Sequence, residues 1–410
     1  MDFSLTRMRA AVYLLLGLPL LASAGLSFDE AARLARDQAP ALQAQRSALD
    51  GAQALLPAAA TLPDPRLIVG LDNLPVTGAD RFSTSADFMT MQRIGVMQEV
   101  PNAAKREARA AGAQARIERE RAVLAAAELT VRRDAALAWL AVYFAEDRAA
   151  QLTSLERENR LLQDTLDARI ASGKALPAER TMARIDALMV ADRRDDALRD
   201  VERARASLRR WVGARAAEPL EGGPPPLQVS AERLRADLHR HAEIAPYDAM
   251  QAMARAEARE ADAEQRGDWG WEVVYSRRPQ YGDMMSFQLV FDLPWDRERR
   301  QQPQLTAKLR EAARIEAERA DTMRRHAEEI DGQLAELKAL DAQHTRLERQ
   351  ALALNAERVA LALASYQAGR GDLGAVLVAR REAVETRLRL IDLDAQRAAL
   401  RVRLNNLIAE

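Results

Sequence analysis

Two stretches of about 70 residues contain almost no helix breaker, and they constrain the fold more than any other feature of the chain. Residues 102–169 contain no proline, and residues 295–368 contain only Pro303, near the start. At 1.5 Å per residue, a helix of that length spans about 100 Å. Heptad spacing of apolar residues predicts coiled-coil packing in both stretches. The residues at this spacing are Ile117, Leu124, Val131, Ala138 and Leu152 in the first stretch and Leu340, Leu347, Leu354 and Leu361 in the second.

The composition favours long helices over ordinary globular domains. Aromatic residues make up only 4% of the chain and charged residues 30%, a mixture typical of extended helical proteins. The net charge of −1 gives no electrostatic footprint for nucleic acid. The chain has no cysteine, which excludes disulfides, thiolate metal sites and a lipid attached to cysteine. We find no phosphate-binding loop, nucleophile elbow or catalytic triad, and we expect neither enzymatic activity nor a cofactor.

The first 24 residues have the pattern of a secretory signal peptide. Arg7 and Arg9 precede an apolar run over residues 10–21, and Ala22-Ser23-Ala24 supplies a cleavage site before Gly25. A membrane anchor is the alternative, but a spanning helix needs about 20 apolar residues. No other segment approaches that length, so we expect an exported protein that does not enter a membrane by helices.

The remainder divides into two similar halves around a segment rich in proline and glycine. We predict a first repeat at residues 25–218, a linker at 219–229 and a second repeat at 230–410. Each half contains a helix with a proline, an extended segment ending in proline, a long helix, a glycine and a return helix. These landmarks are Pro40, Pro101 and Gly173 in the first half and Pro246, Pro294 and Gly369 in the second.

The extended segments show the alternation of a membrane-facing β-strand, with apolar residues at every second position. We predict lipid contact for Leu67, Val69, Leu71, Trp271, Val273, Tyr275, Phe287, Leu289 and Phe291. Gln288 and Asp292 would then face water. A soluble hairpin packed on the helices is the alternative. Four strands cannot close a barrel, and open sheet edges are not tolerated in lipid, so a membrane protein would require symmetric assembly.

The duplicated order of helix, hairpin, long helix, glycine and return helix resembles the TolC family of outer-membrane efflux proteins over nearly the whole mature chain. The resemblance implies a mainly α fold, in which antiparallel coiled-coil helices form a periplasmic α-barrel. It also implies a homotrimer whose chains each contribute four strands to a twelve-stranded β-barrel in outer-membrane lipid. Residues 62–67, 70–75 and 94–101 are similar to the heavy-metal branch, which serves cobalt–zinc–cadmium and copper–silver pumps.

The family docks its adaptor and closes its pore at the two helical tips. The resemblance assigns these roles to Arg169, Ser172, Gly173, Leu176, Tyr366, Gly369 and Leu373. We expect the small and apolar members of each tip, with Ala171 and Ala368, to project as knobs. The acidic pair that narrows the pore in well-known members is replaced here by Ala375 and Val378. Glu179 and Asp372 are the nearest acidic residues, and we interpret both as ordinary surface carboxylates.

The four histidines do not form a metal-binding pattern in the sequence. His239 and His241 lack carboxylate or thiolate partners at ligand spacing, so we interpret them as surface residues. His326 lies in a charged run, and His344 lies partly on a heptad track. Methionines 89, 91, 97, 284 and 285 cluster in the strands, where lipid contact or gap filling is the preferred interpretation. We therefore predict no metal site.

These observations lead to a functional hypothesis with two alternatives. The chain is predicted to be a passive outer-membrane channel with a large periplasmic portion, exporting heavy-metal cations. Its partners would be a periplasmic adaptor, also called a membrane fusion protein, and an inner-membrane resistance-nodulation-division pump. A similar duct for drugs or for secreted polypeptides is the first alternative. A soluble periplasmic coiled-coil scaffold is the second.

Overall fold

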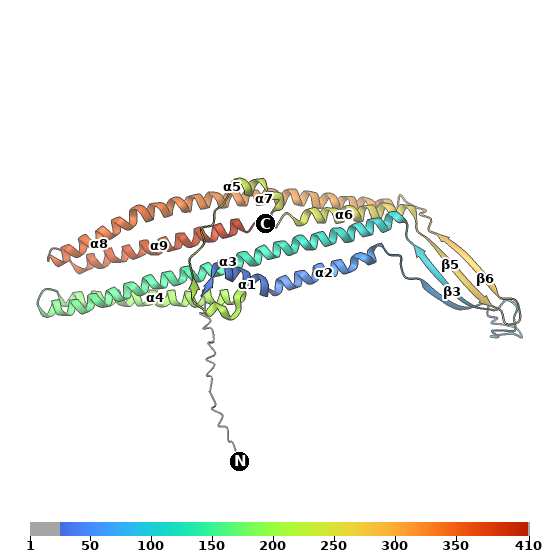
Figure 1. Cartoon of the computed structure of the whole chain (residues 1–410), viewed down its shortest axis with the longest axis horizontal. Helices are drawn as coiled ribbons and strands as arrows, with labels where there is room; N and C mark the ends of the chain where they lie inside the picture. Colours follow the sequence, from blue (N-terminus) through green and yellow to red (C-terminus); the bar gives the residue numbers. More distant parts are fainter. Residues whose placement is uncertain (1–24, 409–410) are drawn as a thin grey trace, which may run out of the picture.

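The computed structural model describes residues 25–408, which form a long rod of helices with a four-stranded sheet at one end (Figure 1). The predicted signal peptide, residues 1–24, lies outside the described residues. The first half contains β1 (Leu26–Ser27), α1 (Phe28–Gln38), α2 (Pro40–Ala60), β2 (Arg66–Asp72), β3 (Met91–Val100), α3 (Ala103–Ala171), α4 (Pro177–Val212), the short helix η1 (Gly213–Ala217) and β4 (Leu220–Glu221).

The second half repeats the same order of a helix, a hairpin, a long helix, a tight turn and a return helix. Its elements are α5 (Ala231–Ala236), η2 (Leu238–Arg240), α6 (Pro246–Ala263), η3 (Glu264–Arg266), β5 (Trp269–Arg277), β6 (Met284–Phe291), α7 (Gln301–Arg346), the π-helical turn η4 (Leu347–Ala351), α8 (Leu352–Gln367) and α9 (Leu373–Asn405). Pro40 and Pro246 each begin the helix before the hairpin, where a missing N–H costs nothing. The predicted fold class, mainly α with four strands from one chain, is confirmed.

The helix α3 runs through 69 residues, or about 100 Å, and connects the sheet to the far tip. It begins where predicted, because the Asn102 side chain accepts a hydrogen bond of 2.9 Å from the Lys105 N–H and caps the first turn. Near the sheet α3 packs against α2 and α6, and near the tip it packs against α4. The predicted heptad positions Ile117, Val131 and Leu152 are all buried.

The second long helix differs from its prediction in two respects. It begins at Gln301 rather than Trp295, because the preceding residues form a turn in which the Asp296 carbonyl accepts a hydrogen bond from the Arg300 N–H. It is also interrupted by η4, a π-helical turn. Before this turn Leu340 is 6% exposed, but after it Leu354 and Leu361 are each 64% exposed. The predicted apolar stripe is therefore buried in its first part and open to solvent in its last.

The strands form one antiparallel sheet in the order β2-β3-β5-β6, so the two hairpins lie side by side. A carboxylate fixes this sheet to the rod. Asp268, next to β5, accepts hydrogen bonds from the Asn102 N–H at 2.9 Å and from Lys105 Nζ at 3.1 Å. Burial alone would raise the pKa of Asp268, but these donors outweigh it and hold the pKa below its usual value. The junction therefore favours the charged carboxylate.

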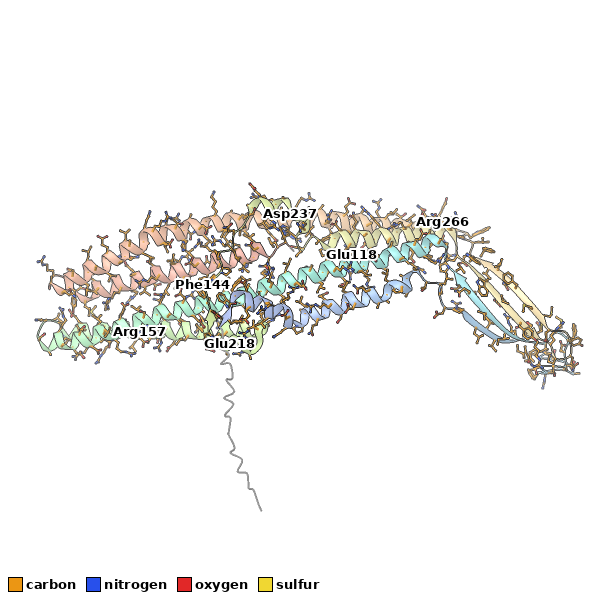
Figure 2. All side chains as sticks on the ribbon, viewed as in Figure 1. Glu118, Phe144, Arg157, Glu218, Asp237 and Arg266 are labelled. Carbon is orange, nitrogen blue, oxygen red and sulfur yellow. The ribbon has the colours of Figure 1, made fainter. Side chains whose placement is uncertain are left out.

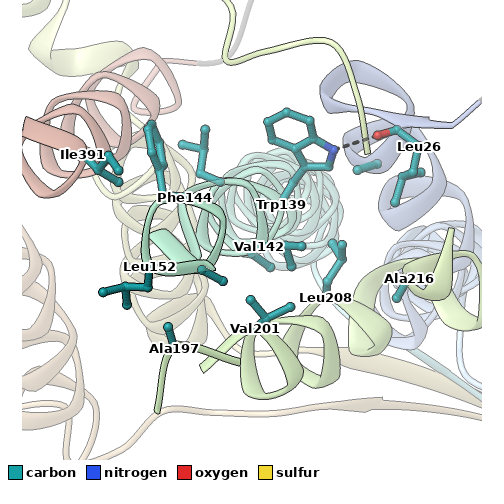
Figure 3. Close-up of a cluster of buried hydrophobic side chains, with 14 of the residues drawn as sticks. Leu26, Trp139, Val142, Phe144, Leu152, Ala197, Val201, Leu208, Ala216 and Ile391 are labelled. Atoms are coloured by element: carbon teal, nitrogen blue, oxygen red, sulfur yellow. Dashed lines mark hydrogen bonds between the residues drawn. The ribbon is translucent and has the colours of Figure 1, made fainter. Parts of the chain in front are cut away.

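The largest hydrophobic cluster lies in the middle of the rod, where α1, α3, α4 and α9 meet (Figure 3). Trp139 of α3 is completely buried there, and its indole Nε1–H donates a 2.9 Å hydrogen bond to the Leu26 carbonyl. Leu26 in turn pairs with Leu220 in the short parallel sheet of β1 and β4. This contact holds the beginning and the end of the first half against the same turn of α3.

Side chains project from the rod along its whole length (Figure 2). Some of the charged ones connect the two halves, since Arg148 of α3 pairs with Asp392 of α9 and Arg193 of α4 pairs with Glu385 of α9. Such exposed pairs contribute little individually, so the hydrophobic clusters carry most of the stability. Within residues 25–408, no helix is both long enough and apolar enough to cross a membrane.

Replacing Trp139 tests the central cluster. We expect Trp139→Ala to lower the free energy of unfolding by about 3–5 kcal/mol, since it removes a buried aromatic side chain and leaves a cavity. Trp295, whose side chain is 93% exposed, is the matched control. Urea unfolding followed by circular dichroism measures both variants. Equal losses for Trp139→Ala and Trp295→Ala would contradict the assignment of the core.

Candidate functional site

The two helical tips, where the rod ends opposite the sheet, are built by the same backbone motif. At the first tip Gly173 has φ +69°, the Gly173 N–H donates to the Ile170 carbonyl at 3.0 Å and the Lys174 N–H donates to the Arg169 carbonyl at 2.8 Å. This pattern is a complete Schellman motif. Glycine adopts the left-handed conformation without a steric cost, which explains why the helix reverses at this residue.

The second tip repeats this geometry at Gly369, which has φ +73°. The Gly369 N–H donates to the Tyr366 carbonyl at 3.1 Å, and the Arg370 N–H donates to the Ser365 carbonyl at 3.0 Å. Asp372 then caps α9 by accepting a 2.7 Å hydrogen bond from the Ala375 N–H. Asp372 is exposed, as interpreted from the sequence, and its carboxylate also caps this helix.

A small apolar cluster joins the two tips to each other. It comprises Leu166, Ala183, Tyr366, Leu373, Val376 and Leu377, from α3, α4, α8 and α9. Above it, the Arg169 guanidinium lies 4.5 Å from the centre of the Tyr366 ring, within the range of a cation–π interaction. The Tyr366 hydroxyl donates a 2.8 Å hydrogen bond to Glu179 Oε2. One tyrosine of the second half is thus held by a cation and an anion of the first half.

The protonation of Tyr366 favours this contact. Burial raises the pKa of Tyr366, and its hydrogen bond to the Glu179 carboxylate raises that pKa further. The hydroxyl therefore remains a donor at neutral pH. A second connection lies farther from the tip. There the Asp186 carboxylate of α4 accepts a 2.6 Å hydrogen bond from the Arg381 guanidinium of α9 and a 2.9 Å hydrogen bond from the Asn159 side-chain amide of α3. Together these polar contacts form a closure that joins α8 and α9 to α3 and α4 near the tips.

The structure changes the roles of several predicted tip residues. Leu373 is completely buried and Tyr366 is 6% exposed, so the prediction of Leu373 as a projecting knob is wrong. Both side chains instead hold the tips together. Glu179 is not an ordinary surface carboxylate, since it accepts the Tyr366 hydroxyl. Other predicted residues do project into solvent, and these are Ala171, Ser172, Gly173, Leu176, Ala368 and Gly369.

Two exposed residues of α9 occupy the positions at which the resemblance expects an acidic pair. Ala375 and Val378 lie on one face of α9 and are exposed, whereas the intervening Val376 and Leu377 are buried in the tip cluster. Spacing of three residues places two side chains on the same helical face. This face therefore presents small and apolar groups in place of carboxylates.

The sheet at the opposite end of the rod separates apolar and polar side chains onto its two faces. In the register, Leu67 lies beside Val96, Val273 and Phe287 along one row, and the neighbouring row contains Val69. All nine residues predicted to contact lipid belong to this face by their position in the register. Phe287 is 67% exposed and Val69 is 71% exposed. A single chain therefore leaves a broad apolar surface open.

The opposite face of the sheet is polar and contains an ion cluster. Arg93 of β3 lies between Asp72 of β2, at 3.2 Å, and Glu272 of β5, at 2.8 Å. Gln288, which is predicted to face water, lies beside Glu272 on this polar face. The Arg93 cluster was not predicted from the sequence. The sequence feature that could have indicated this cluster is the presence of charged residues at the strand positions that alternate with apolar residues.

Two histidines are buried, and for His241 this contradicts its interpretation as a surface residue. His241 is completely buried and His326 is 5% exposed. Nδ1 of His241 lies 2.7 Å from Nε2 of His326. Burial, followed by the neighbouring His326 ring, lowers the pKa of His241 to about 4. The carboxylates of Glu243 and Glu329 lie on the other side of the His326 ring.

Comparison with solved structures places this architecture among outer-membrane proteins. A membrane protein from Pseudomonas aeruginosa superposes with a TM-score of 0.80 at 17% identity, covering 92% of this chain and 91% of that one. The outer membrane protein VceC from Vibrio cholerae superposes with a TM-score of 0.77 at 18% identity, covering 93% of this chain and 97% of VceC. CusC, which forms a transmembrane channel, superposes with a TM-score of 0.78 at 15% identity, covering 93% of this chain and 92% of CusC.

No protein-family model and no curated protein matches the sequence. The likeness to known proteins is therefore one of structure. The structural likeness extends over nearly the whole described chain and includes both the helical rod and the sheet. The chain therefore has the fold of these membrane proteins.

Removing one hydroxyl group tests the contact between the tips. Tyr366→Phe keeps the ring beneath Arg169 but removes the hydrogen bond to Glu179, and a hydrogen bond to a charged group contributes about 1.5–3 kcal/mol. We expect amide hydrogen exchange at residues 362–373 to accelerate by about tenfold or more. Tyr247→Phe, which loses a 3.2 Å contact with Thr322 in another part of the rod, is the control. Unchanged exchange in Tyr366→Phe would contradict the closure.

Proposed function

We propose that the chain is the passive outer-membrane duct of a tripartite efflux system and that it acts as a homotrimer. The observation that carries this proposal is an exposed apolar sheet face at the end of a helical rod of about 100 Å. In water such a face has no apolar partner, whereas lipid supplies one. The polar face, with Arg93 and Glu272, is suited to line an aqueous pore.

The sheet also requires further copies of the chain. β2 and β6 are its two edges, and unpaired strand edges are not tolerated inside a bilayer. Edge-to-edge pairing around a symmetry axis satisfies both edges, and three copies of four strands give a twelve-stranded barrel. The likeness to outer-membrane channels over 92–93% of the chain supports this arrangement.

Unpartnered surface on the rod supports the same assembly. The chain exposes 26168 Å², whereas a compact monomer of 45.5 kDa exposes about 16,000 Å². Part of this surface is apolar, including Leu354 and Leu361 after the π-helical turn and Ile185 and Leu188 on α4. A second copy of the chain would cover these residues, and three copies would enclose a helical tunnel in the periplasm.

The tips are the proposed meeting point with the rest of the system. Leu176, Ala171 and Ala368 are exposed there, and they would seat against a periplasmic adaptor. The contact of Arg169 and Glu179 with Tyr366 would hold the tunnel closed until docking. The chain contains no nucleotide-binding motif, so the inner-membrane pump would supply the energy.

The proposed cargo is a heavy-metal cation. Support comes from the sequence alone, since residues 62–67, 70–75 and 94–101 are similar to the branch that serves cobalt–zinc–cadmium and copper–silver pumps. The first of these segments leads into the start of β2, the second spans its end, and the third covers the last residues of β3.

Arginine substitutions on the two faces of β6 test the membrane assignment. Leu289→Arg on the apolar face should sharply reduce trimer in the outer-membrane fraction, because arginine at a lipid-facing site near mid-membrane costs about 2–4 kcal/mol. Gln288→Arg, one residue away on the polar face, is the matched control and should insert normally. Heat-modifiable trimers on gels measure both. Equal loss in the two variants would show that the faces are assigned incorrectly.

A valine at the second tip tests docking and transport. Gly369→Val should leave the protein trimeric and inserted, because the sheet lies a full helix length away. It should nevertheless abolish resistance to heavy-metal salts, since a β-branched residue resists the positive φ of this turn. Gly332→Val is the control, because Gly332 lies inside α7 with open space around it.

Growth in metal salts distinguishes the parts of this proposal. Full resistance in the Gly369→Val strain would remove the tips from the docking role. If deleting the whole gene leaves metal resistance unchanged, the cargo assignment fails, and a duct for drugs or polypeptides becomes the better account.

A further inference from the structure

The buried histidine pair joins the segment before α6 to the middle of α7. His241 follows η2, and its backbone pairs with Ile408 near the end of the described chain. His326 belongs to α7. The two rings meet edge to face, with their centres 4.9 Å apart and their planes at 86°. The 2.7 Å separation between Nδ1 of His241 and Nε2 of His326 requires one shared proton.

The remaining nitrogen of His326 has no hydrogen-bond partner although it is buried. This atom, Nδ1, lies 3.3 Å from Glu243 Oε2 and 3.7 Å from Glu329 Oε2. Neither carboxylate oxygen meets the geometry of a hydrogen bond from the ring. Buried polar atoms are nearly always satisfied. An imidazole nitrogen and two carboxylate oxygens thus converge without a hydrogen bond between them, an arrangement suited to a cation.

The spacing of the three donors fits a small divalent metal ion. One ligand atom from each of Glu243, His326 and Glu329 lies within 4.8 Å of the other two. Two donors at about 2.0–2.2 Å from a tetrahedral Zn²⁺ are about 3.3–3.6 Å apart, close to the two distances from His326 Nδ1. Imidazole favours Zn²⁺ over Mg²⁺ and Ca²⁺, and the lack of sulfur ligands disfavours Cu⁺.

We propose that Glu243, His326 and Glu329 bind a divalent transition-metal cation of the Zn²⁺ class, with His241 as a positioning residue. In this arrangement His326 donates its Nε2–H to Nδ1 of His241, which leaves the Nδ1 lone pair facing the carboxylates. Metal-binding histidines commonly donate their second nitrogen to such a partner, which fixes both the tautomer and the ring orientation.

The surrounding charges leave the site accessible. Arg325 lies 3.4 Å from the other oxygen of Glu243, Oε1, so Oε2 remains directed at His326. The side chains of Glu243 and Glu329 are 49% and 53% exposed, which gives an ion and a completing water molecule access from solvent. A bound cation would also reduce the repulsion between the two carboxylates.

The ion would have a structural role distinct from transport. Ala242, next to His241, donates its N–H to the Leu407 carbonyl at 2.9 Å. Binding would therefore hold the residues that follow α9, the segment before α6 and the middle of α7 together. This role does not depend on what the proposed duct carries.

Titration with Zn²⁺ tests the site. The probe is Zn²⁺ alone, added to the tag-free, chelator-treated full-length protein in detergent and followed by isothermal titration calorimetry. We expect one Zn²⁺ per chain. Affinity should fall about tenfold or more in His326→Gln, whose amide still reaches His241 but lacks an atom at the Nδ1 position. The Glu243→Gln/Glu329→Gln double variant should lose the same affinity, and its half-exposed side chains make a folding defect easy to avoid.

His344→Gln is the matched control. His344 also lies beside two carboxylates, but Asp394 faces its Nε2 at 3.0 Å and Glu348 faces its Nδ1 at 3.6 Å, so one ion cannot be shared. This variant should bind Zn²⁺ as the unaltered chain does. Absence of binding to the unaltered protein, or unaltered affinity in the double variant, overturns the site. Neither result depends on the pump, so the proposed transport function is tested separately.

The positioning role of His241 has its own test. His241→Leu removes the acceptor and should weaken Zn²⁺ binding about 10–100-fold, the range for partners outside the ligand set. His241→Asn keeps a polar atom at the δ position and should restore most of the affinity. Equal affinity in the Leu and Asn variants would overturn this role, because a merely structural contribution would not distinguish them.

Discussion

The geometry of the molecule depends on the continuity of α3. This helix runs through 69 residues, and most helical stability in proteins comes from tertiary packing. Here the packing partners change along the length, with α2 and α6 near the sheet and α4 near the tip. The Trp139 cluster lies between these two regions. Because α3 is unbroken, it fixes the distance between the sheet and the tip.

Features that depend on local periodicity could be predicted from the sequence. Gly173 and Gly369 both adopt a positive φ at the tips. A helix that ends in a sharp reversal commonly needs a residue with positive φ, and glycine adopts that conformation most readily. Alternation along the strands placed Leu289 and Gln288 on opposite faces, as the register has them. These inferences need only the helical and strand repeats, which short stretches of sequence contain.

Features that depend on contacts between distant segments could not be predicted in the same way. His241 and His326 are 85 positions apart, and neither has a sequence pattern that indicates the other. Leu373 is predicted to project as a knob because it is an apolar neighbour of the tip glycine, yet the four-helix cluster buries it. Nothing in the sequence near Glu179 indicated its hydroxyl partner, since Tyr366 comes from the other half of the chain.

The π-helical turn at Leu347–Ala351 gives the second long helix a change of phase. One extra residue in a turn rotates everything beyond it by about 100° relative to an uninterrupted helix. A single leucine repeat can therefore face the chain's own core at Leu340 and the outside at Leu361. The extra residue in this turn thus sets the rotation of the following leucine repeat about the helix axis. Deleting the one extra residue here would restore a continuous α-helix, and the residues beyond it would keep their orientation because the lost residue and the regained α-helical turn compensate.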